Sequence, residues 1–355
     1  MPRFTPEHLR QIGYEIFEAV GCLPEDARIV TDHLVESSLF GHDSHGMIRL
    51  YEYISFVKRG VWNPRGVPKI VSERPCTAIV DGDRAFGQIS AAFATRVAMA
   101  KAREHGTGTV TLRNCSHVGR CGAYPLMVAR ERMMGIAFVN AGRLGRQIAP
   151  FGGLDGKLST NPIAFASPRR GADPIMVDMA TSVVAEGKVR VYRNRGDRLP
   201  EGWITNHDGD TSRDPNDYLE SGGAILPLGG VAGHKGYCLS FIVEMLGGTL
   251  SGEGVASGEV DMTSNGVLLT VYDIEHFTDL ETYYDEVETL ISHVQTSRVD
   301  PNLGEILVPG EPEFRSAKER TEKGIEIDPT TWSRICSEAE TIGLNPNSWQ
   351  SDRIS

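Results

Sequence analysis

The chain has 355 residues, of which 40% are apolar and 23% are charged. This composition is typical of a folded globular protein and excludes disordered and collagen-like chains. At about 100 to 200 residues per domain, the length predicts two domains, or one large core with an appendage. There are 36 Lys and Arg residues against 47 Asp and Glu residues, a net charge of −11. Because this charge repels phosphate backbones, we expect no nucleic-acid partner.

The cysteines and the apolar runs indicate the compartment. Six cysteines are scattered without a CxxC pair, which is typical of free thiols in a reducing environment. The N-terminal residues carry charges where a signal peptide needs an apolar run. The longest apolar stretch, residues 237–250, contains Glu244 and is too short and polar to span a bilayer. We therefore expect no membrane association and a cytoplasmic location.

Helices are predicted at both ends of the chain. Thr5 and Pro6 are the N-cap and first residue of the first helix, which ends at Gly21. A second helix is predicted from Pro24 to Gly41 and a third from about His45 to Gly60. A C-terminal helix is predicted from Asp328 to Ala339, so both chain ends can join one helical layer.

Strands and helices alternate irregularly between these ends, which predicts a mixed α/β core rather than a doubly wound sheet. Strands are expected at 77–80, 108–112, 136–139, 163–166, 175–178, 266–272 and 306–308. Helices are expected at 90–104, 123–131, 182–192, 237–250 and 280–294.

No familiar nucleotide-binding motif is present. Gly106-Thr107-Gly108 precedes a strand, whereas the Rossmann glycines follow one. The segment 152–158 is one residue short of a P-loop, and Leu158 occupies the Ser/Thr position. The sequence also lacks GxSxG and HExxH motifs. These absences disfavour a Rossmann fold and the common hydrolase sites.

The segment 41–53 contains the first group of candidate site residues. A helix starting near His45 would place His45, Arg49 and Tyr53 on one face, beside a capping Ser44. An imidazole beside a guanidinium and a phenol can exchange a proton while binding a carboxylate. A solvated helix face is the alternative interpretation. A metal site at His42 and His45 lacks a third ligand, so we expect no metal.

A second group follows the strand that ends at Leu112. In the segment 114–124, polar residues and glycines lead into a helix, where α/β proteins place binding loops. His117 is a second candidate proton carrier, although a structural loop histidine is equally compatible with this pattern. Short segments at 140–146, 160–162, 178–182 and 233–237 could approach a phosphate through backbone amides, and Lys235 begins a helix.

Taken together, these segments resemble the malate/L-lactate dehydrogenase family of the non-Rossmann type, whose relatives include ureidoglycolate, sulfolactate and diketogulonate dehydrogenases and cyclic-imine carboxylate reductases. The matching segments run in order along nearly the whole chain: 41–53, 114–124, 150–168, 178–188, 233–252 and 309–312. The Gly-His-Lys-Gly-Tyr run before an apolar helix is the rarest of these motifs.

This resemblance implies an α/β (α+β) fold with a mixed, largely antiparallel nucleotide-binding core. The helical domain would comprise residues 1–75 with 310–355, and the core residues 76–309. It also implies a homodimer that binds NAD or NADP and transfers a hydride between nicotinamide and a small 2-hydroxy or 2-oxo acid, such as malate or lactate.

The resemblance assigns roles by position. His45 and His117 would be catalytic, and Ser44, Arg49 and Tyr53 would bind the substrate carboxylate. The cofactor segments contain Asn161, Met176, Val177, Asp178, Met179, Ala180, Thr181, Ser182, His234, Lys235, Gly310, Glu311 and Pro312.

Several alternatives remain open on sequence grounds. The hydride could go instead to a cyclic imino acid, such as a pyrroline or piperideine carboxylate. A catalytically silent metabolite-binding protein could keep the same fold. The sequence favours His45 over His117 as the base, because the neighbouring Arg49 would keep its imidazole neutral. Neither the choice of base nor that between NAD and NADP is decided.

Overall fold

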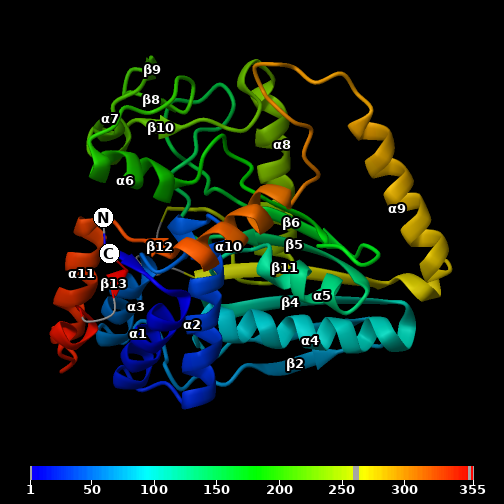
Figure 1. The fold of residues 1–355 in the computed structure, drawn as a ribbon, viewed down its shortest axis with the longest axis horizontal. Coiled ribbons are helices and arrows are strands. Elements are labelled where there is room, and N and C mark those ends of the chain that lie inside the picture. The colour runs from blue at the N-terminus through cyan, green and yellow to red at the C-terminus, as the bar shows by residue number, and fades with distance from the viewer. Residues whose placement is uncertain (1, 259–263, 351–352, 355) are drawn as a thin grey trace.

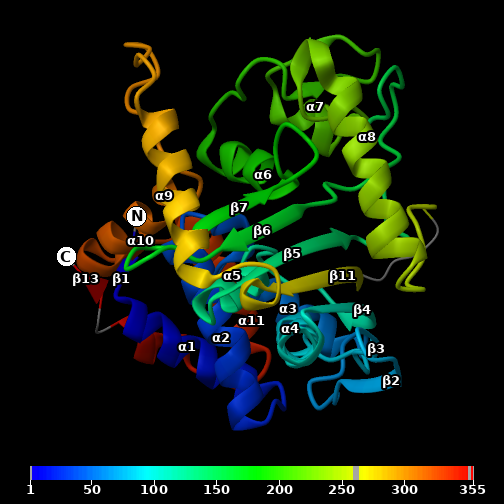
Figure 2. The same ribbon diagram turned by 90° about the vertical axis from the view of Figure 1, so that its right-hand side faces the viewer.

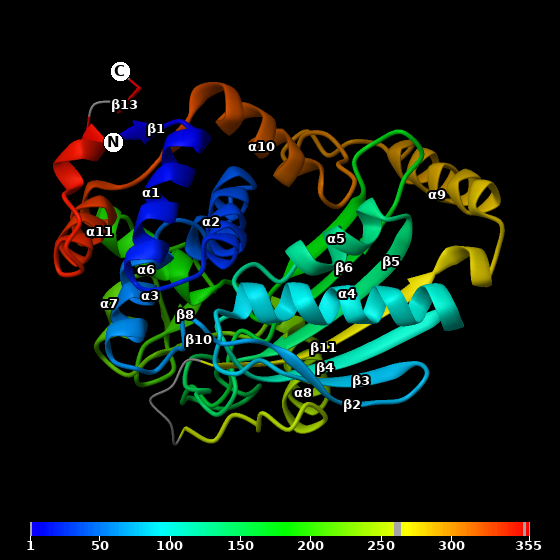
Figure 3. The same cartoon turned by 90° about the horizontal axis from the view of Figure 1, so that it is seen from below.

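The computed structural model describes residues 2–258, 264–350 and 353–354. Its helices from the two chain ends form one layer, which lies against one end of a large twisted sheet (Figure 1). Both described termini lie on the helical side of the molecule. A smaller lobe with short strands lies beyond the sheet, and α9 lies at the opposite edge, away from the helical layer (Figures 1 and 3).

The main sheet has seven strands in the order β2-β3-β4-β11-β5-β6-β7. Within it, β3 and β4 are parallel and all the other neighbouring pairs are antiparallel. The strands are β2 (Lys69–Glu73), β3 (Thr77–Asp81), β4 (Thr107–Ser116), β5 (Met133–Asn140), β6 (Ile163–Ser167), β7 (Ile175–Met179) and β11 (Ser264–Asp273). One small sheet contains β1 (Arg3–Phe4), β12 (Ile325–Glu326) and β13 (Arg353–Ile354). A second small sheet contains β8 (Ile204–Thr205), β9 (Thr211–Ser212) and β10 (Ala224–Ile225).

Helices cover both faces of the main sheet (Figure 2). The α-helices are α1 (Pro6–Ala19), α2 (Pro24–Leu39), α3 (Arg49–Lys58), α4 (Gly87–His105), α5 (Ala123–Arg130), α6 (Glu186–Arg195), α7 (Pro215–Leu219), α8 (Gly233–Val243), α9 (Leu280–Gln295), α10 (Glu311–Lys323) and α11 (Pro329–Glu340). Short turns are η1 (Asp43–His45), η2 (Gly230–Ala232), η3 (Glu244–Thr249), η4 (Ile274–His276) and η5 (Pro346–Gln350), of which η3 is π-helical.

The helical layer has its own apolar core, built from both chain ends. Thr5 caps α1 by accepting a hydrogen bond from the amide of His8, and Pro6 begins the helix. Phe4 packs on Trp332 of α11, with ring centroids 4.5 Å apart. Burying each such large side chain contributes about 1.5–3 kcal/mol. This packing fixes α3, which carries several of the candidate site residues.

The sheet is packed closely against α4 on one face. A Cβ at Gly108 of β4 would lie 2.1 Å from the carbonyl oxygen of Ala98 in α4. Glycine is therefore required at this crossing. On the other face, α8 and η3 contact β5, and η3 also contacts β11. The strand ends near α3 and η3 are consequently held by helices on both faces.

Most of the predicted elements are confirmed, and several differ. The helix predicted at 237–250 begins at Gly233 and is π-helical from Glu244. The expected strand at 306–308 is wrong, because this segment is irregular and leads to α10. The third helix begins at Arg49 rather than near His45, since Gly46 has a non-helical backbone (φ −95°, ψ −145°) that interrupts the helix after η1. The predicted helix at 182–192 begins only at Glu186. The mixed, largely antiparallel sheet is confirmed.

All six cysteines are free thiols in this structure, as expected. Among the described residues, no helix has the length and apolar character needed to cross a membrane. Within the same part of the chain, no three His, Cys, Asp or Glu side chains come together as a metal-binding group.

His33 of α2 predicts how stability depends on pH. Burial, with a smaller contribution from Arg120, lowers the pKa of His33 to about 3. The unfolded chain therefore takes up a proton below pH 6.5 that the folded state rejects. This group should cost about 1.4 kcal/mol of stability per pH unit between pH 6.5 and 3, and nothing above pH 6.5.

Urea denaturation of wild type and His33→Gln across pH 4–8 measures this effect. Glutamine retains an acceptor for the Arg120 amide, which donates to the ring of His33 at 2.8 Å. We expect the variant to lose stability less steeply below pH 6.5. Identical slopes would show that His33 is not the group responsible.

Candidate active site

A cavity of about 450 Å³ lies between the helical layer and the ends of the sheet strands. Helix α3 and the turn η1 supply one wall, and the loop after β4 supplies another. The third wall comes from the ends of β5 and β11, the segment before β6, and α6. The cavity therefore forms where segments far apart in the sequence meet.

The two predicted histidines face each other in this cavity. The rings of His45 and His117 are stacked, with centroids 5.5 Å apart and an interplanar angle of 15°. The Oγ of Ser44 lies 3.0 Å from Nδ1 of His45. The hydroxyl of Tyr53 lies 2.8 Å from Nδ1 of His117. Each ring is thus held through one nitrogen, which leaves Nε2 for another partner.

A hydrogen-bond chain defines the tautomer of His117. Gln88 Nε2 donates to the hydroxyl oxygen of Tyr53 at 2.9 Å. The phenol of Tyr53 is 1% exposed and has one hydrogen, which would be left unpaired if Nδ1 were the donor, so we infer that Tyr53 donates to Nδ1 of His117. His117 then carries its ring proton on Nε2. In this arrangement His117 donates, rather than accepts, a hydrogen bond through Nε2.

The cavity keeps both imidazoles neutral. Burial, followed by the charge of Arg49, lowers the pKa of His45 well below the ordinary value, and the same two causes act on the pKa of His117. The direction predicted for His45 is confirmed, although burial contributes more than Arg49. Burial also raises the pKa of Tyr53, which keeps this phenol protonated. The site is therefore neutral at its two rings across physiological pH.

Arg49 is the first cation of a charged network on the cavity wall. It donates through Nε to the carbonyl oxygen of Ser44 at 2.7 Å and through Nη1 to Glu52 at 2.5 Å. Burial opposes the ionisation of Glu52, but the charge and hydrogen bond of Arg49, with the smaller contributions of Arg190 and Arg334, together more than offset it and lower the pKa of this carboxyl. A guanidinium has five N–H donors, so three remain after these two bonds.

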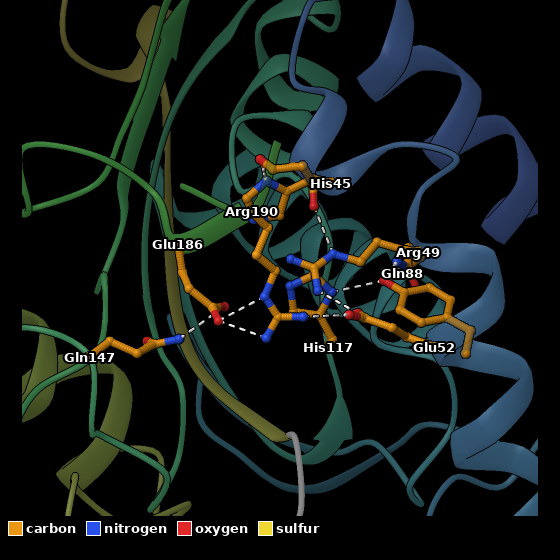
Figure 4. Close-up of polar contacts among 10 residues, drawn as sticks. His45, Arg49, Glu52, Gln88, His117, Gln147, Glu186 and Arg190 are labelled. Carbon is orange, nitrogen blue, oxygen red and sulfur yellow. Dashed lines mark hydrogen bonds and ion pairs between the residues drawn. The ribbon is translucent and has the colours of Figure 1, made fainter. Parts of the chain in front are cut away.

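Arg190 of α6 extends this network across the cavity (Figure 4). Its Nη1 lies 3.3 Å from Glu52, and its Nε and Nη2 donate to Glu186 at 3.0 and 2.7 Å. Gln147 Nε2 donates to the other oxygen of Glu186 at 3.3 Å. These bonds connect the helical layer to the α6 lobe.

The structure brings four of the five predicted catalytic and substrate-binding residues together at this cavity. His45, Arg49, Tyr53 and His117 all line the cavity, although they do not share one helix face. Ser44 is 6% exposed and lies outside the lining, with its hydroxyl on His45. Tyr53 is 1% exposed and is hydrogen-bonded to His117. The geometry thus favours a role for Ser44 and Tyr53 in holding the two imidazole rings, rather than in contacting the substrate.

Among the predicted cofactor residues, Asn161 alone lines the cavity. Met176, Val177, Asp178 and Met179 belong to β7, and Ala180, Thr181 and Ser182 follow it. Thr181 accepts a backbone hydrogen bond from Leu228, close to the start of α8, where His234 and Lys235 are exposed.

The remaining predicted cofactor segment, residues 310–312, lies at the other end of β7. Gly310 precedes α10, which Glu311 and Pro312 begin. The amide of Met176 donates to the carbonyl of Pro309 at 3.0 Å. A Cβ at Gly310 would lie 3.0 Å from the Met176 nitrogen. The predicted cofactor segments thus form a continuous band along β7, beside the cavity.

Several cavity residues were not predicted. Glu52 lies inside the segment 41–53, and its position one turn from Arg49 was the available signal. Glu186, Arg190 and Gln147 come from segments whose meeting depends on the fold. The sequence offers no local signal that Arg190 crosses to Glu52.

Comparisons with known proteins agree with this fold. A family described as malate/L-lactate dehydrogenase matches residues 4–336. A malate dehydrogenase of Pyrococcus abyssi is 38% identical over 351 residues, covering 96% of this chain and 95% of the relative.

Two solved structures have the same fold. A malate dehydrogenase structure from Pyrococcus horikoshii has a TM-score of 0.87 at 35% identity, covering 97% of this chain and 96% of that one. A Δ1-piperideine-2-carboxylate reductase structure from Pseudomonas syringae pvar. tomato has a TM-score of 0.82 at 28% identity, covering 96% of this chain and 100% of that one.

Proposed function

Because the chain belongs to the malate/L-lactate dehydrogenase family, we propose that it is an NAD- or NADP-dependent dehydrogenase of a small 2-hydroxy acid such as malate or lactate. The observation that carries this proposal is the stacked pair of neutral imidazoles beside Arg49 in an enclosed cavity. Such a cavity can bind a carboxylate and exchange one proton with a hydroxyl or carbonyl oxygen.

The reaction requires one acceptor for a hydride and a different acceptor for a proton. A nicotinamide cofactor, when bound, accepts a hydride at C4. As the C2–H bond of the hydroxy acid breaks, the O–H proton passes to the protein and a 2-oxo acid forms. His45 is the proposed base: its Nδ1–H donates to Ser44, which leaves Nε2 as the acceptor. His117, protonated on Nε2, donates a hydrogen bond to the same substrate oxygen.

Arg49 is the proposed partner of the substrate carboxylate. Its three remaining N–H donors can form a forked pair with two carboxylate oxygens. Glu52 and the Ser44 carbonyl fix its orientation before the substrate arrives. This fixed orientation reduces the conformational entropy lost on binding.

The chain also has residues that suit the phosphates of a dinucleotide. Helix α8 has no side-chain cap at its N-terminus, although the amides of Gly233 and Gly236 already donate to the carbonyls of Gly230 and Leu228. The dipole of the helix favours an anion at this end. Lys235 and His234 are exposed in its first turn. We propose that this turn binds cofactor phosphate, together with the band along β7 and Gly310, Glu311 and Pro312.

Substituting each histidine tests the chemistry. We expect His45→Asn to lower the turnover of hydroxy acid oxidation by about 10²- to 10⁴-fold, because a general base contributes this much. His117→Asn should lower turnover less and raise the Michaelis constant more. Nicotinamide absorbance measures both, after fluorescence has confirmed that each variant still binds reduced cofactor.

The pH dependence gives a second criterion. A base must be neutral to accept a proton, and the pKa of His45 lies well below 6.5. Wild-type oxidation should therefore be independent of pH from 6.5 to neutrality and fall only at lower pH. Wild-type turnover and pH dependence in both variants would refute the mechanism.

A cyclic imino acid is the second candidate substrate, because the fold is shared with a piperideine-2-carboxylate reductase. Reduction of an imine uses the same hydride, and the imine also carries an acid group near its reacting carbon. Wild-type rates with malate, lactate and piperideine-2-carboxylate, each with both cofactors, distinguish the two candidates.

We further propose that the protein is a homodimer. Helix α8 and the turn η3 expose Phe241, Ile242 and Met245 at 49%, 46% and 47%. Helix α9 exposes Leu290 and Val294 at 59% and 42%. Exposed apolar rows of this kind mark interaction surfaces. Together with the free thiols, which suit a reducing compartment, this supports a cytoplasmic dimer.

Sedimentation equilibrium tests the dimer. We expect wild type at twice the mass of the chain and Phe241→Asp/Met245→Asp at the monomer mass, because two carboxylates in a dry interface are costly. Val67→Asp, at a position that is 67% exposed elsewhere, is the matched control. A monomeric wild type would refute the proposal.

A further inference from the structure

Four polar side chains are buried together where the strands reach the cavity. Asn140 ends β5, Asn161 precedes β6, and Asn265 lies at the start of β11. Glu244 begins η3 on the opposite side of the strand ends. Their exposed fractions are 0%, 1%, 5% and 4% in that order. The three asparagines line the cavity, whereas Glu244 lies behind them.

Glu244 accepts hydrogen bonds at both carboxylate oxygens. Oε1 accepts from Asn161 Nδ2 at 2.8 Å. Oε2 accepts from Asn140 Nδ2 at 3.2 Å and from the amide of Ala256 at 3.1 Å. A buried carboxylate is costly without such donors, so these bonds fix the direction of both asparagine amides.

The hydrogen bonds continue from Glu244 to the His117 loop. Asn265 Nδ2 donates to the carbonyl oxygen of Asn140 at 2.8 Å. Asn265 Oδ1 accepts from the amide of Val118 at 2.8 Å. Val118 is the residue after His117. The backbone at His117 is therefore attached to Glu244 through two asparagines, while Tyr53 holds its ring from the other side.

The local backbone is adapted to this contact. The helix widens into the π-helical turn η3 at Glu244, and such turns are frequent at functional sites. A Cβ at Gly248 would lie 2.4 Å from Asn140 Nδ2. Glycine thus allows the turn to approach the strand end closely enough for Glu244 to reach Asn140.

We propose that Glu244 is a positioning residue, which sets the place of the His117 ring in the cavity through Asn140 and Asn265. The chemical meaning of this placement rests on the proposed function, in which His117 contacts the reacting oxygen. Glu244 itself touches neither substrate nor cofactor in this arrangement.

The variant Glu244→Gln tests the proposal with little change in volume. One oxygen remains for Asn161, but an NH2 group now faces the Asn140 amide, so two donors oppose each other. Displacing a catalytic group by about 1 Å can cost about 10²-fold. We expect kcat to fall by about 10- to 100-fold, while the Michaelis constant of the hydroxy acid changes by less than about two-fold, because Arg49 lies outside this network.

Asn140 offers no rescue by exchange, because its Nδ2 also donates to the carbonyl oxygen of Gly254 at 2.8 Å, which an aspartate oxygen would oppose. Glu244→Gln is therefore compared with wild type and with one control variant. Glu286→Gln, at an exposed position on α9, is the control and should behave as wild type.

A readout without turnover separates this proposal from the proposed function. In ¹⁵N-histidine spectra of the full chain, which has 10 histidines, Glu244→Gln should shift the His117 signal, whereas Glu286→Gln should leave it unchanged. An unchanged His117 signal would overturn the positioning role, even in an active enzyme. A kcat that falls only in proportion to the folded fraction would also overturn it. An absence of dehydrogenase activity in wild type would refute the proposed function alone.

Discussion

The hydrogen bond between Tyr53 and His117 is the contact on which the site depends. It joins α3 of the helical layer to the loop after β4, at 2.8 Å between Oη and Nδ1. Tyr53 reaches this position because its ring is packed among apolar residues that include Trp62 and Phe86. The core made by both chain ends thereby determines where a candidate catalytic ring lies. Packing and chemistry are linked at this single contact.

The cavity combines low polarity at its two imidazoles with a charged wall. Burial keeps His45 and His117 neutral by lowering the pKa of each ring, and Arg49 strengthens this effect. The cations Arg49 and Arg190 are paired with the carboxylates of Glu52 and Glu186. A substrate acid therefore meets oriented N–H donors without a large excess of positive charge. This arrangement suits the binding and release of a small anion.

The helix starts and the candidate site segments are predicted well by local signals in the sequence. Thr5-Pro6 and Asp328-Pro329 identified helix starts, because caps act within one turn. The segments around His45 and His117 were found because polar residues and glycines cluster there. The predicted helix through His45 is interrupted at Gly46, where the backbone is not helical and packs so closely on Ser38 that a Cβ would meet its side chain. Arg190, Glu186 and Glu244 were missed because their partners are distant in sequence.

In the proposed reaction, the C2 hydrogen of a hydroxy acid leaves as a hydride while the hydroxyl proton goes to the protein. Turnover of [2-²H]malate or [2-²H]lactate with oxidised cofactor, followed by NMR of the reduced cofactor, tests this claim most directly. We predict that the deuterium is found at C4 of the nicotinamide and that none enters the solvent. Deuterium in the solvent instead would contradict direct hydride transfer in this cavity.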